Sequence, residues 1–155
     1  MAQRFFLDKF KVKSPAFDHH HEIPDKHTSN GEDVSPELQW SGAPEGTQAF
    51  AVVCHDPDAP LVDGWTHWVA YGIAGDAEGL PEGVEGLKEG PNTGGEDGYN
   101  GPAPPPDHGN HHYYFWVYAL DEDLDLEPGL DRRQLLEAIE DNVLEQTRLV
   151  GTYKN

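Results

Sequence analysis

The sequence is poor in cysteine and has no long hydrophobic run. Cys54 is the only cysteine among 155 residues, which excludes an intramolecular disulfide. No apolar stretch reaches the length of a transmembrane helix, and the N-terminus lacks the apolar core of a signal peptide. We therefore predict a cytoplasmic protein without stable membrane insertion.

Positive charge is scarce as well. Ten Lys and Arg residues stand against 29 Asp and Glu residues, which gives a net charge of -19 with neutral His. A field of this sign repels polyanions, so we exclude non-specific nucleic-acid binding and docking on an anionic membrane. The acidic residues are scattered along the chain, which favours adaptation to high salt. An acidic patch for a cationic partner is the alternative interpretation.

The chain contains no internal repeat and no linker, so residues 1–155 are predicted to form a single domain. Short apolar runs are separated by loops rich in Gly, Pro and Asp, which is typical of a mostly β protein. The run Phe50–Cys54 is almost continuously apolar and is expected to be a central strand buried on both faces. The predicted strands are Phe5–Val12, Leu38–Trp40, Phe50–Cys54, His67–Ile73, His111–Leu120 and Leu149–Tyr153.

One helix is predicted near the end of the chain. Asp131 can cap it, and Gln134 stands three residues later, which is the spacing of a capping box. Five apolar residues then follow at helical spacing on one face. These residues are Leu135, Leu136, Ile139, Val143 and Leu144. The expected fold is a β-sandwich with one or two small peripheral helices.

Three polar clusters stand beside the predicted strands and could carry chemistry. They are His55–Pro60, Trp65–Trp68, and the segment Asp97–Pro105, which is followed by His111–Tyr113. Prolines stiffen the first cluster, and glycines in the third allow backbone N–H groups to approach a ligand. Each cluster also has a purely structural interpretation, as a capped turn, a buried histidine or part of the aromatic core. Their order along the chain is therefore more informative than any one of them.

That order resembles the phosphatidylethanolamine-binding protein family, and most closely its prokaryotic branch of Raf-kinase-inhibitor-like proteins. The similarity runs from about Ser14 to Tyr153. It is carried by Ser35–Trp40 (SPELQW), Asp56–Pro60 (DPDAP), Gly64–Trp68 (GWTHW), Gly98–Pro105 (GYNGPAPP), His111–Tyr113 (HHY), Tyr118–Asp121 (YALD) and Leu149–Tyr153 (LVGTY).

The resemblance implies two β-sheets with a small cavity at one end that binds anions and phosphorylated groups. By motif position, Asp56, His67, His111 and Tyr113 correspond to the cavity side chains of the family. Two imidazoles and a backbone N–H could donate to a phosphate oxygen, and a carboxylate fits better as the acceptor that orients one imidazole. The rim of the cavity corresponds to Gly101 and Pro102.

This chain departs from the family at three places, one of which is the run His19–His21, where the family implies no chemistry. His112 stands where relatives commonly have Arg after the second cavity histidine, which weakens the case for a fixed positive charge near the cavity. Asp141 and Asn142 stand where relatives often have Gly-His.

The favoured function is a ligand-binding or regulatory protein for a small anionic or phosphorylated ligand, without enzymatic activity, cofactor or metal. An inhibitor-type protein-interaction module and a metal-assisted hydrolase are the alternatives, and a homodimer is compatible with the resemblance. The run His19–His21 could capture a transition metal, but adjacent histidines rarely converge on one ion. No nucleophile elbow or zinc-protease helix occurs, and Cys54 lies inside an apolar run.

Overall fold

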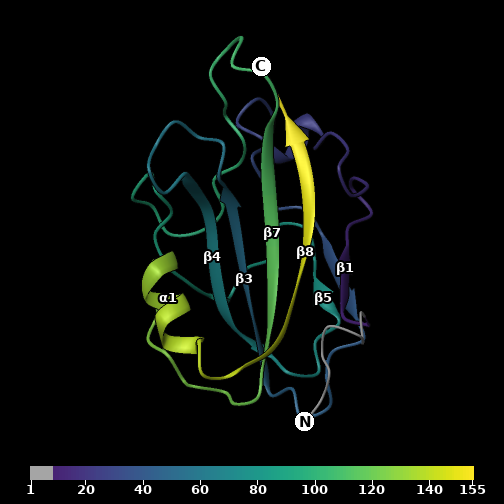
Figure 1. The fold of residues 1–155 in the computed structure, drawn as a ribbon. Coiled ribbons are helices and arrows are strands. Elements are labelled where there is room, and N and C mark those ends of the chain that lie inside the picture. The colour runs from purple at the N-terminus through teal and green to yellow at the C-terminus, as the bar shows by residue number, and fades with distance from the viewer. Residues whose placement is uncertain (1–8) are drawn as a thin grey trace.

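The computed structural model describes residues 9–155, which form two antiparallel β-sheets and one α-helix (Figure 1). The smaller sheet has the strand order β1-β2-β5, and the larger sheet has the order β6-β4-β3-β7-β8. The elements in chain order are β1 (Lys11–Lys13), the 3-10 helix η2 (Asp25–His27), β2 (Leu38–Ser41), β3 (Ala49–Asp56), β4 (Trp65–Ala74), β5 (Gly79–Leu80), β6 (Lys88–Glu89), β7 (His111–Leu120), α1 (Arg132–Ile139) and β8 (Val143–Tyr153). The prediction of a mostly β, two-sheet fold is confirmed.

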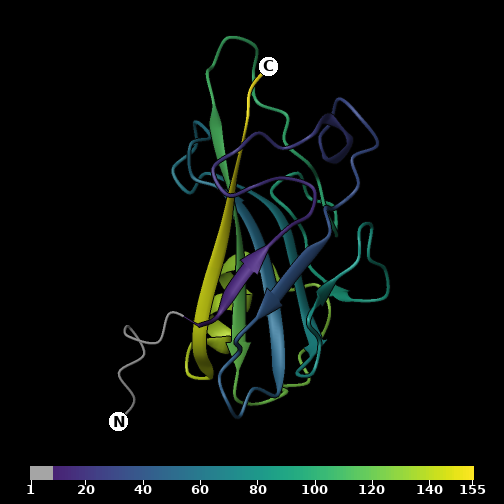
Figure 2. The same ribbon diagram turned by 90° about the vertical axis from the view of Figure 1, so that its right-hand side faces the viewer.

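The two sheets pack face to face, and α1 lies on the outer side of the larger sheet (Figure 2). The cluster between the sheets includes Trp40 of β2, Phe50 of β3 and Phe115 of β7. A second cluster packs Leu135 and Ile139 of α1 against the larger sheet. Strand β3 therefore lies between two apolar layers, and all eight of its residues are buried. This confirms the central strand predicted from its apolar run, because only a strand covered on both faces excludes water from every side chain.

The strong β segment of the sequence has the predicted bounds, His111–Leu120. Strand β4 contains the predicted segment His67–Ile73 and extends beyond both of its ends. The first predicted strand, Phe5–Val12, begins outside the described residues, and the observed strand β1 covers Lys11–Lys13. Aromatic and β-branched runs thus located the central strands well, because their side chains fill both apolar layers.

The helix begins as predicted. The Asp131 carboxylate accepts a hydrogen bond from the backbone N–H of Gln134, and the Gln134 side chain accepts one from the Asp131 N–H. Both halves of the capping box are therefore present. They give hydrogen-bond partners to two backbone N–H groups that have none within the helix.

The prediction that Val143 and Leu144 continue the helix face is wrong, because both residues lie in β8. The helix ends at Ile139, and β8 then pairs with β7 along its whole length, from Val143 opposite Leu120 to Tyr153 opposite His111. The predicted last strand, Leu149–Tyr153, is the end of this longer strand. Pairing with a ten-residue neighbour outweighs the weak helical preference of the segment.

The topology brings the termini of three neighbouring strands together at one end of the larger sheet. Strands β4 and β7 are both antiparallel neighbours of β3, so the end of β3 meets the starts of the other two. Asp56 pairs with Trp65 across one boundary, and His55 pairs with Tyr114 across the other. The segment Asp97–Pro105 returns to the same end of the sheet, where the Asn100 N–H donates to the His67 carbonyl at 2.8 Å.

Candidate functional site

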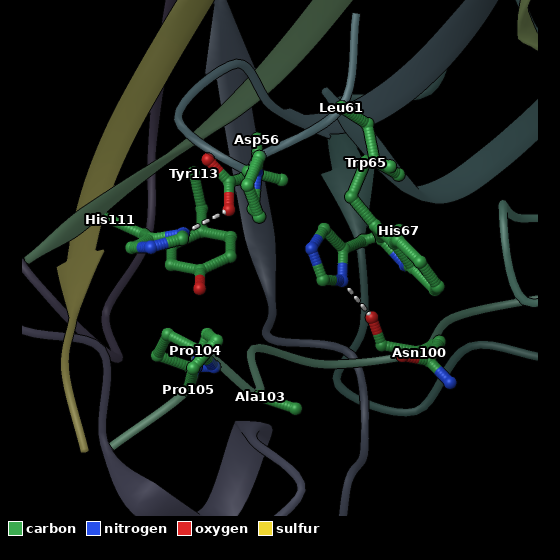
Figure 3. Close-up of a pocket in the computed structure, with 12 residues that line it drawn as sticks. Asp56, Leu61, Trp65, His67, Asn100, Ala103, Pro104, Pro105, His111 and Tyr113 are labelled. Atoms are coloured by element: carbon green, nitrogen blue, oxygen red, sulfur yellow. Dashed lines mark hydrogen bonds and ion pairs between the residues drawn. The ribbon is translucent and has the colours of Figure 1, made fainter. Parts of the chain in front are cut away.

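A cavity of about 390 Å³ lies at this end of the larger sheet (Figure 3). Its polar side chains come from the end of β3 and from the starts of β4 and β7, and the segment after Asn100 forms the opposite wall. The lining residues are Asp56, Ala59, Pro60, Leu61, Trp65, His67, Asn100, Ala103, Pro104, Pro105, His111 and Tyr113. Apolar side chains form most of the wall, and no Lys or Arg is among the lining residues.

Asp56 and His111 form a buried pair in the cavity. The Nδ1 atom of His111 lies 2.7 Å from Oδ2 of Asp56, and each side chain is only 3% exposed. The other carboxylate oxygen accepts the backbone N–H of Asp58 at 2.7 Å. Burial raises the pKa of the Asp56 carboxyl, and the hydrogen bond from His111 opposes that shift. The carboxylate therefore keeps the Nδ1 proton on His111 and fixes the plane of its ring.

His67 is held by a single strong contact to the backbone. Its Nδ1 atom lies 2.5 Å from the carbonyl oxygen of Asn100 and donates to it, because a carbonyl can only accept. Burial lowers the pKa of His67 to about 4, so the ring is neutral at pH 7. The second ring nitrogen then carries a lone pair, and it points to the side of the cavity on which Asp56 and Tyr113 lie (Figure 3). The expectation that both imidazoles donate does not fit this neutral His67, which presents an acceptor.

His108 is a neighbour of the site that the sequence interpretation missed. Its Nδ1 atom lies 2.6 Å from Nε2 of His111, the ring nitrogen that Asp56 leaves free. His108 is exposed and sits in a turn where Asp107 and Gly109 have positive φ values of 62° and 81°. The only signal for this contact was the spacing of three residues between the two histidines. Asp56, His111 and His108 thus form a hydrogen-bonded chain from the buried end of the cavity to solvent.

Tyr113 supplies a hydroxyl that has no hydrogen-bond partner among residues 9–155. Its ring meets the edge of His67 at a centroid distance of 5.1 Å and stacks on His111 at 6.4 Å. Burial raises the pKa of this hydroxyl far above its usual range, so it stays protonated and can donate at neutral pH. The hydroxyl points toward Pro104, into the cavity (Figure 3).

Gly101 and Pro102, which the resemblance placed at the rim, are not among the residues that line the cavity. The Gly101 N–H donates to the Asp33 carboxylate at 2.7 Å, and both residues are buried away from the cavity lining. A Cβ on Gly101 would lie 2.3 Å from the His27 carbonyl oxygen, so glycine is required there for close packing of two backbone segments. The wall expected from them is formed instead by Asn100 and the Ala103–Pro105 segment. Their place in the sequence motif reflects packing of this segment and not a free backbone donor.

His112, where relatives commonly have Arg, points out of the cavity. Its Nδ1 atom lies 2.7 Å from Oδ2 of Asp58, and both side chains are more than 40% exposed. The same Asp58 oxygen accepts the His112 backbone N–H at 2.8 Å. This pair has the same closest distance as the Asp56–His111 pair but is solvated, so it contributes little by comparison.

The histidine run near the N-terminus is tied to the backbone. His19 Nδ1 accepts the N–H of Val150 at 3.0 Å, and His21 Nδ1 contacts the His19 carbonyl at 3.2 Å. Within residues 9–155, no group of three or more His, Cys, Asp or Glu side chains is arranged to hold a metal ion. Cys54 is fully buried in β3, and burial raises its pKa well above the usual value. No helix in this part of the chain is long and apolar enough to cross a membrane.

Comparison with known proteins agrees with the fold. The family model described as phosphatidylethanolamine-binding protein matches residues 13–154. A UPF0098 protein of Methanothermobacter thermautotrophicus is 43% identical over 150 residues, which are 92% of this chain and 97% of that protein.

Two solved structures are also similar. A homologue of phosphatidylethanolamine-binding protein from Chlamydia trachomatis has a TM-score of 0.89 and 37% identity, over 96% of this chain and 99% of that chain. YbcL of E. coli, described as a new member of the mammalian family, has a TM-score of 0.89 and 29% identity, over 95% and 99% of the two chains. The chain therefore belongs to the phosphatidylethanolamine-binding protein family, in its prokaryotic branch.

Proposed function

We propose that this protein binds a small anionic ligand, a phosphate group or a small phosphorylated molecule, in the cavity at the end of the larger sheet. The observation that carries the proposal is the unpartnered Tyr113 hydroxyl, which points into the cavity between the two rings of His67 and His111. Among residues 9–155 no fully buried side-chain N or O atom lacks a hydrogen-bond partner, so the unpartnered Tyr113 hydroxyl is open to the cavity, where a ligand oxygen can accept a hydrogen bond from it.

The polar groups have distinct roles in this proposal. Tyr113 donates to an anionic oxygen, and the imidazolium form of His111, which has a proton on each ring nitrogen, donates from Nε2 once His108 moves aside. Asp56 does not touch the anion but accepts the Nδ1 proton of His111 and stabilises the imidazolium form, in which both ring nitrogens donate. The apolar wall, with Trp65 and Leu61 at its outer part, receives the organic part of a phosphorylated ligand.

Binding rather than catalysis is proposed because the cavity lining lacks the commonest nucleophiles, and its Asp56 carboxylate is engaged by His111 and by the Asp58 N–H. The lining includes no Ser, Thr, Cys or Lys. The cavity also lacks a permanent cation, so its local field is weak and depends on protonated imidazole. Such a site fits reversible, modest affinity for an anion.

Phosphate titration of Tyr113→Phe tests the proposal, because this change removes only the unpartnered hydroxyl. Backbone amide NMR shifts are followed as inorganic phosphate is added to the wild-type protein and the variant. A hydrogen bond to a charged group contributes about 1.5–3 kcal/mol, so affinity should fall roughly 10- to 100-fold. The fold should be retained, because no hydrogen bond within residues 9–155 is lost.

Tyr114→Phe is the matched control. Tyr114 is the next residue on β7, and its side chain stacks on Trp116 on the opposite face of the sheet. Its phosphate affinity should equal that of the wild-type protein. The proposal fails if the wild-type protein shows no saturable phosphate shifts, or if Tyr113→Phe binds phosphate as tightly as Tyr114→Phe.

A further inference from the structure

His67 offers a hydrogen-bond acceptor, and no donor, to a ligand in the cavity. His67 donates its only proton to the Asn100 carbonyl through Nδ1, at 2.5 Å. The Asn100 N–H in turn donates to the His67 carbonyl at 2.8 Å, so two hydrogen bonds join these residues. A flip of the His67 ring would break the bond from Nδ1 to the Asn100 carbonyl. The cavity-facing nitrogen of His67 is therefore an acceptor, and only a ligand that brings a proton can bond to it.

The groups around His67 make it difficult for the ring to take a second proton from solvent. The titratable side chains that surround it are His55 and Asp56 from β3, and His111 and Tyr113 from β7. Burial is the largest effect on the pKa of His67, and the charges of His55 and His111 lower it further. The Asp56 carboxylate, the one anion of this set, is already paired with His111.

A phosphate monoester can bring the missing proton, whereas a phosphodiester cannot. The second pKa of a phosphate monoester is about 6, so near neutral pH part of it is a monoanion with one P–O–H group. A phosphodiester is also a monoanion, but all of its unesterified oxygens are acceptors. The two ligand classes therefore carry the same charge and differ in one donor.

We propose that the cavity selects acidic phosphate monoesters over phosphodiesters, with the ligand P–O–H donating to His67 Nε2 while its other oxygens accept from Tyr113 and from the imidazolium form of His111. This inference rests on the proposed function and adds the class of ligand to it. The structural basis is the fixed direction of the His67–Asn100 bond, together with the absence of Lys and Arg from the cavity lining.

The test compares methyl phosphate with dimethyl phosphate at pH 6 and pH 8, by NMR titration of the wild-type protein. At pH 6 methyl phosphate should bind at least about tenfold more tightly, because the diester leaves the His67 lone pair without a donor. The monoanion fraction of the monoester falls from roughly one half to one hundredth over this range, so its affinity should drop on the order of 50-fold. Dimethyl phosphate reports the pH dependence of the protein groups alone, including His111, and the decline for methyl phosphate should exceed the decline for dimethyl phosphate by about this factor.

Phenyl phosphate separates the effect of the proton from that of ligand size. It is larger than dimethyl phosphate but carries the same acidic group as methyl phosphate. The inference requires that phenyl phosphate bind at least as well as methyl phosphate. If phenyl phosphate and dimethyl phosphate are both excluded, size explains the preference and the inference is overturned.

His67→Gln provides a second readout. A Gln amide can reach the position of Nε2 and present either an N–H or a carbonyl oxygen, so the preference for methyl phosphate should shrink to within about threefold. Equal binding of both esters by the wild-type protein would overturn the inference and leave the proposed function intact. Absence of binding by both esters and by inorganic phosphate would instead overturn the proposed function. The wild-type comparison decides the question even if His67→Gln does not fold.

Discussion

The Asp56 carboxylate and the His111 imidazole are joined by a 2.7 Å hydrogen bond, although they lie 55 positions apart in the chain. The end of β3 and the start of β7 are antiparallel neighbours, and this places the two side chains on one wall of the cavity. Both side chains are 3% exposed, so water does not compete for the contact. This bond decides which ring nitrogen of His111 is left for other partners.

Replacing Asp56 by Asn should weaken phosphate binding and the fold together. The amide no longer stabilises a protonated His111, and the buried pair loses its charge. We expect phosphate affinity to fall about tenfold or more and the free energy of unfolding to fall by about 1–3 kcal/mol. Urea unfolding and phosphate titration measure the two effects.

Asp58→Asn is the control for this change, because Asp58 and His112 form a pair with the same 2.7 Å distance outside the cavity. Both side chains of this pair are solvated, so the free energy of unfolding should fall by less than about 1 kcal/mol in Asp58→Asn. Phosphate affinity should not change. Equal losses in the two variants would show that the buried pair has no special role.

Replacing His108 by Ala should tighten phosphate binding. In the free protein His108 occupies Nε2 of His111, and the anion must displace it before that nitrogen can donate. A neutral hydrogen bond contributes about 0.5–1.5 kcal/mol net, so its removal should raise affinity by roughly 2- to 10-fold. Phosphate titration at pH 7 measures this change.

His112→Ala is the matched control for His108, because it removes an exposed imidazole that contacts Asp58 outside the cavity. Its phosphate affinity should stay at the wild-type value. If His108→Ala instead weakens binding, His108 is itself a contact of the ligand.

The stability of the protein should fall as the pH drops from about 6.5 to about 4, in part because of His67. Its pKa is about 4 in the folded protein, below the value of about 6.5 expected in the unfolded chain. In this window the unfolded chain binds a proton that the folded protein refuses, so the stabilisation present above pH 6.5 is progressively lost. Between pH 7 and pH 5 the loss from His67 should be about 2 kcal/mol.

Replacing His67 by Asn isolates this contribution in urea unfolding at pH 7 and pH 5. The Asn amide keeps a donor for the Asn100 carbonyl but does not titrate, so its loss of stability should be smaller than that of the wild-type protein by about 2 kcal/mol. Burial also lowers the pKa of His55 to about 4, and this acts in the same direction. The raised pKa of Asp56 acts oppositely, because its stabilisation is full below the unfolded value and is lost as the pH rises. Both effects cancel in the comparison, and equal losses in the two proteins would contradict the role of His67.

Salt should stabilise the protein strongly if its acidic surface is an adaptation to high ionic strength. A net charge of -19 repels itself, and about 1 M salt screens charges beyond about 3 Å. The melting temperature should rise between 0.1 M and 2 M KCl, by about 2–4 °C for each 1 kcal/mol of relieved repulsion. An unchanged or lower melting temperature would favour the cationic-partner interpretation.

The features that the sequence predicted well are those set by local patterns. The continuous apolar run of β3, the aromatic run of β7 and the capping box of Asp131 and Gln134 all appear where expected. The failures came where two distant segments compete or meet. Val143 follows helical spacing but pairs with Leu120 in β8, because the long partner strand is not visible in local periodicity.

The sequence by itself determined the fold class, the family and the four cavity side chains Asp56, His67, His111 and Tyr113, since these follow from residue types in order along one chain. Only the tertiary structure decided what each polar atom does. Gly101 gives its N–H to Asp33, and His108 reaches His111. His67 turns an acceptor toward the cavity because its proton is held by Asn100. The state of a hydrogen-bonding atom depends on partners brought together by folding, and residue identity does not contain that information.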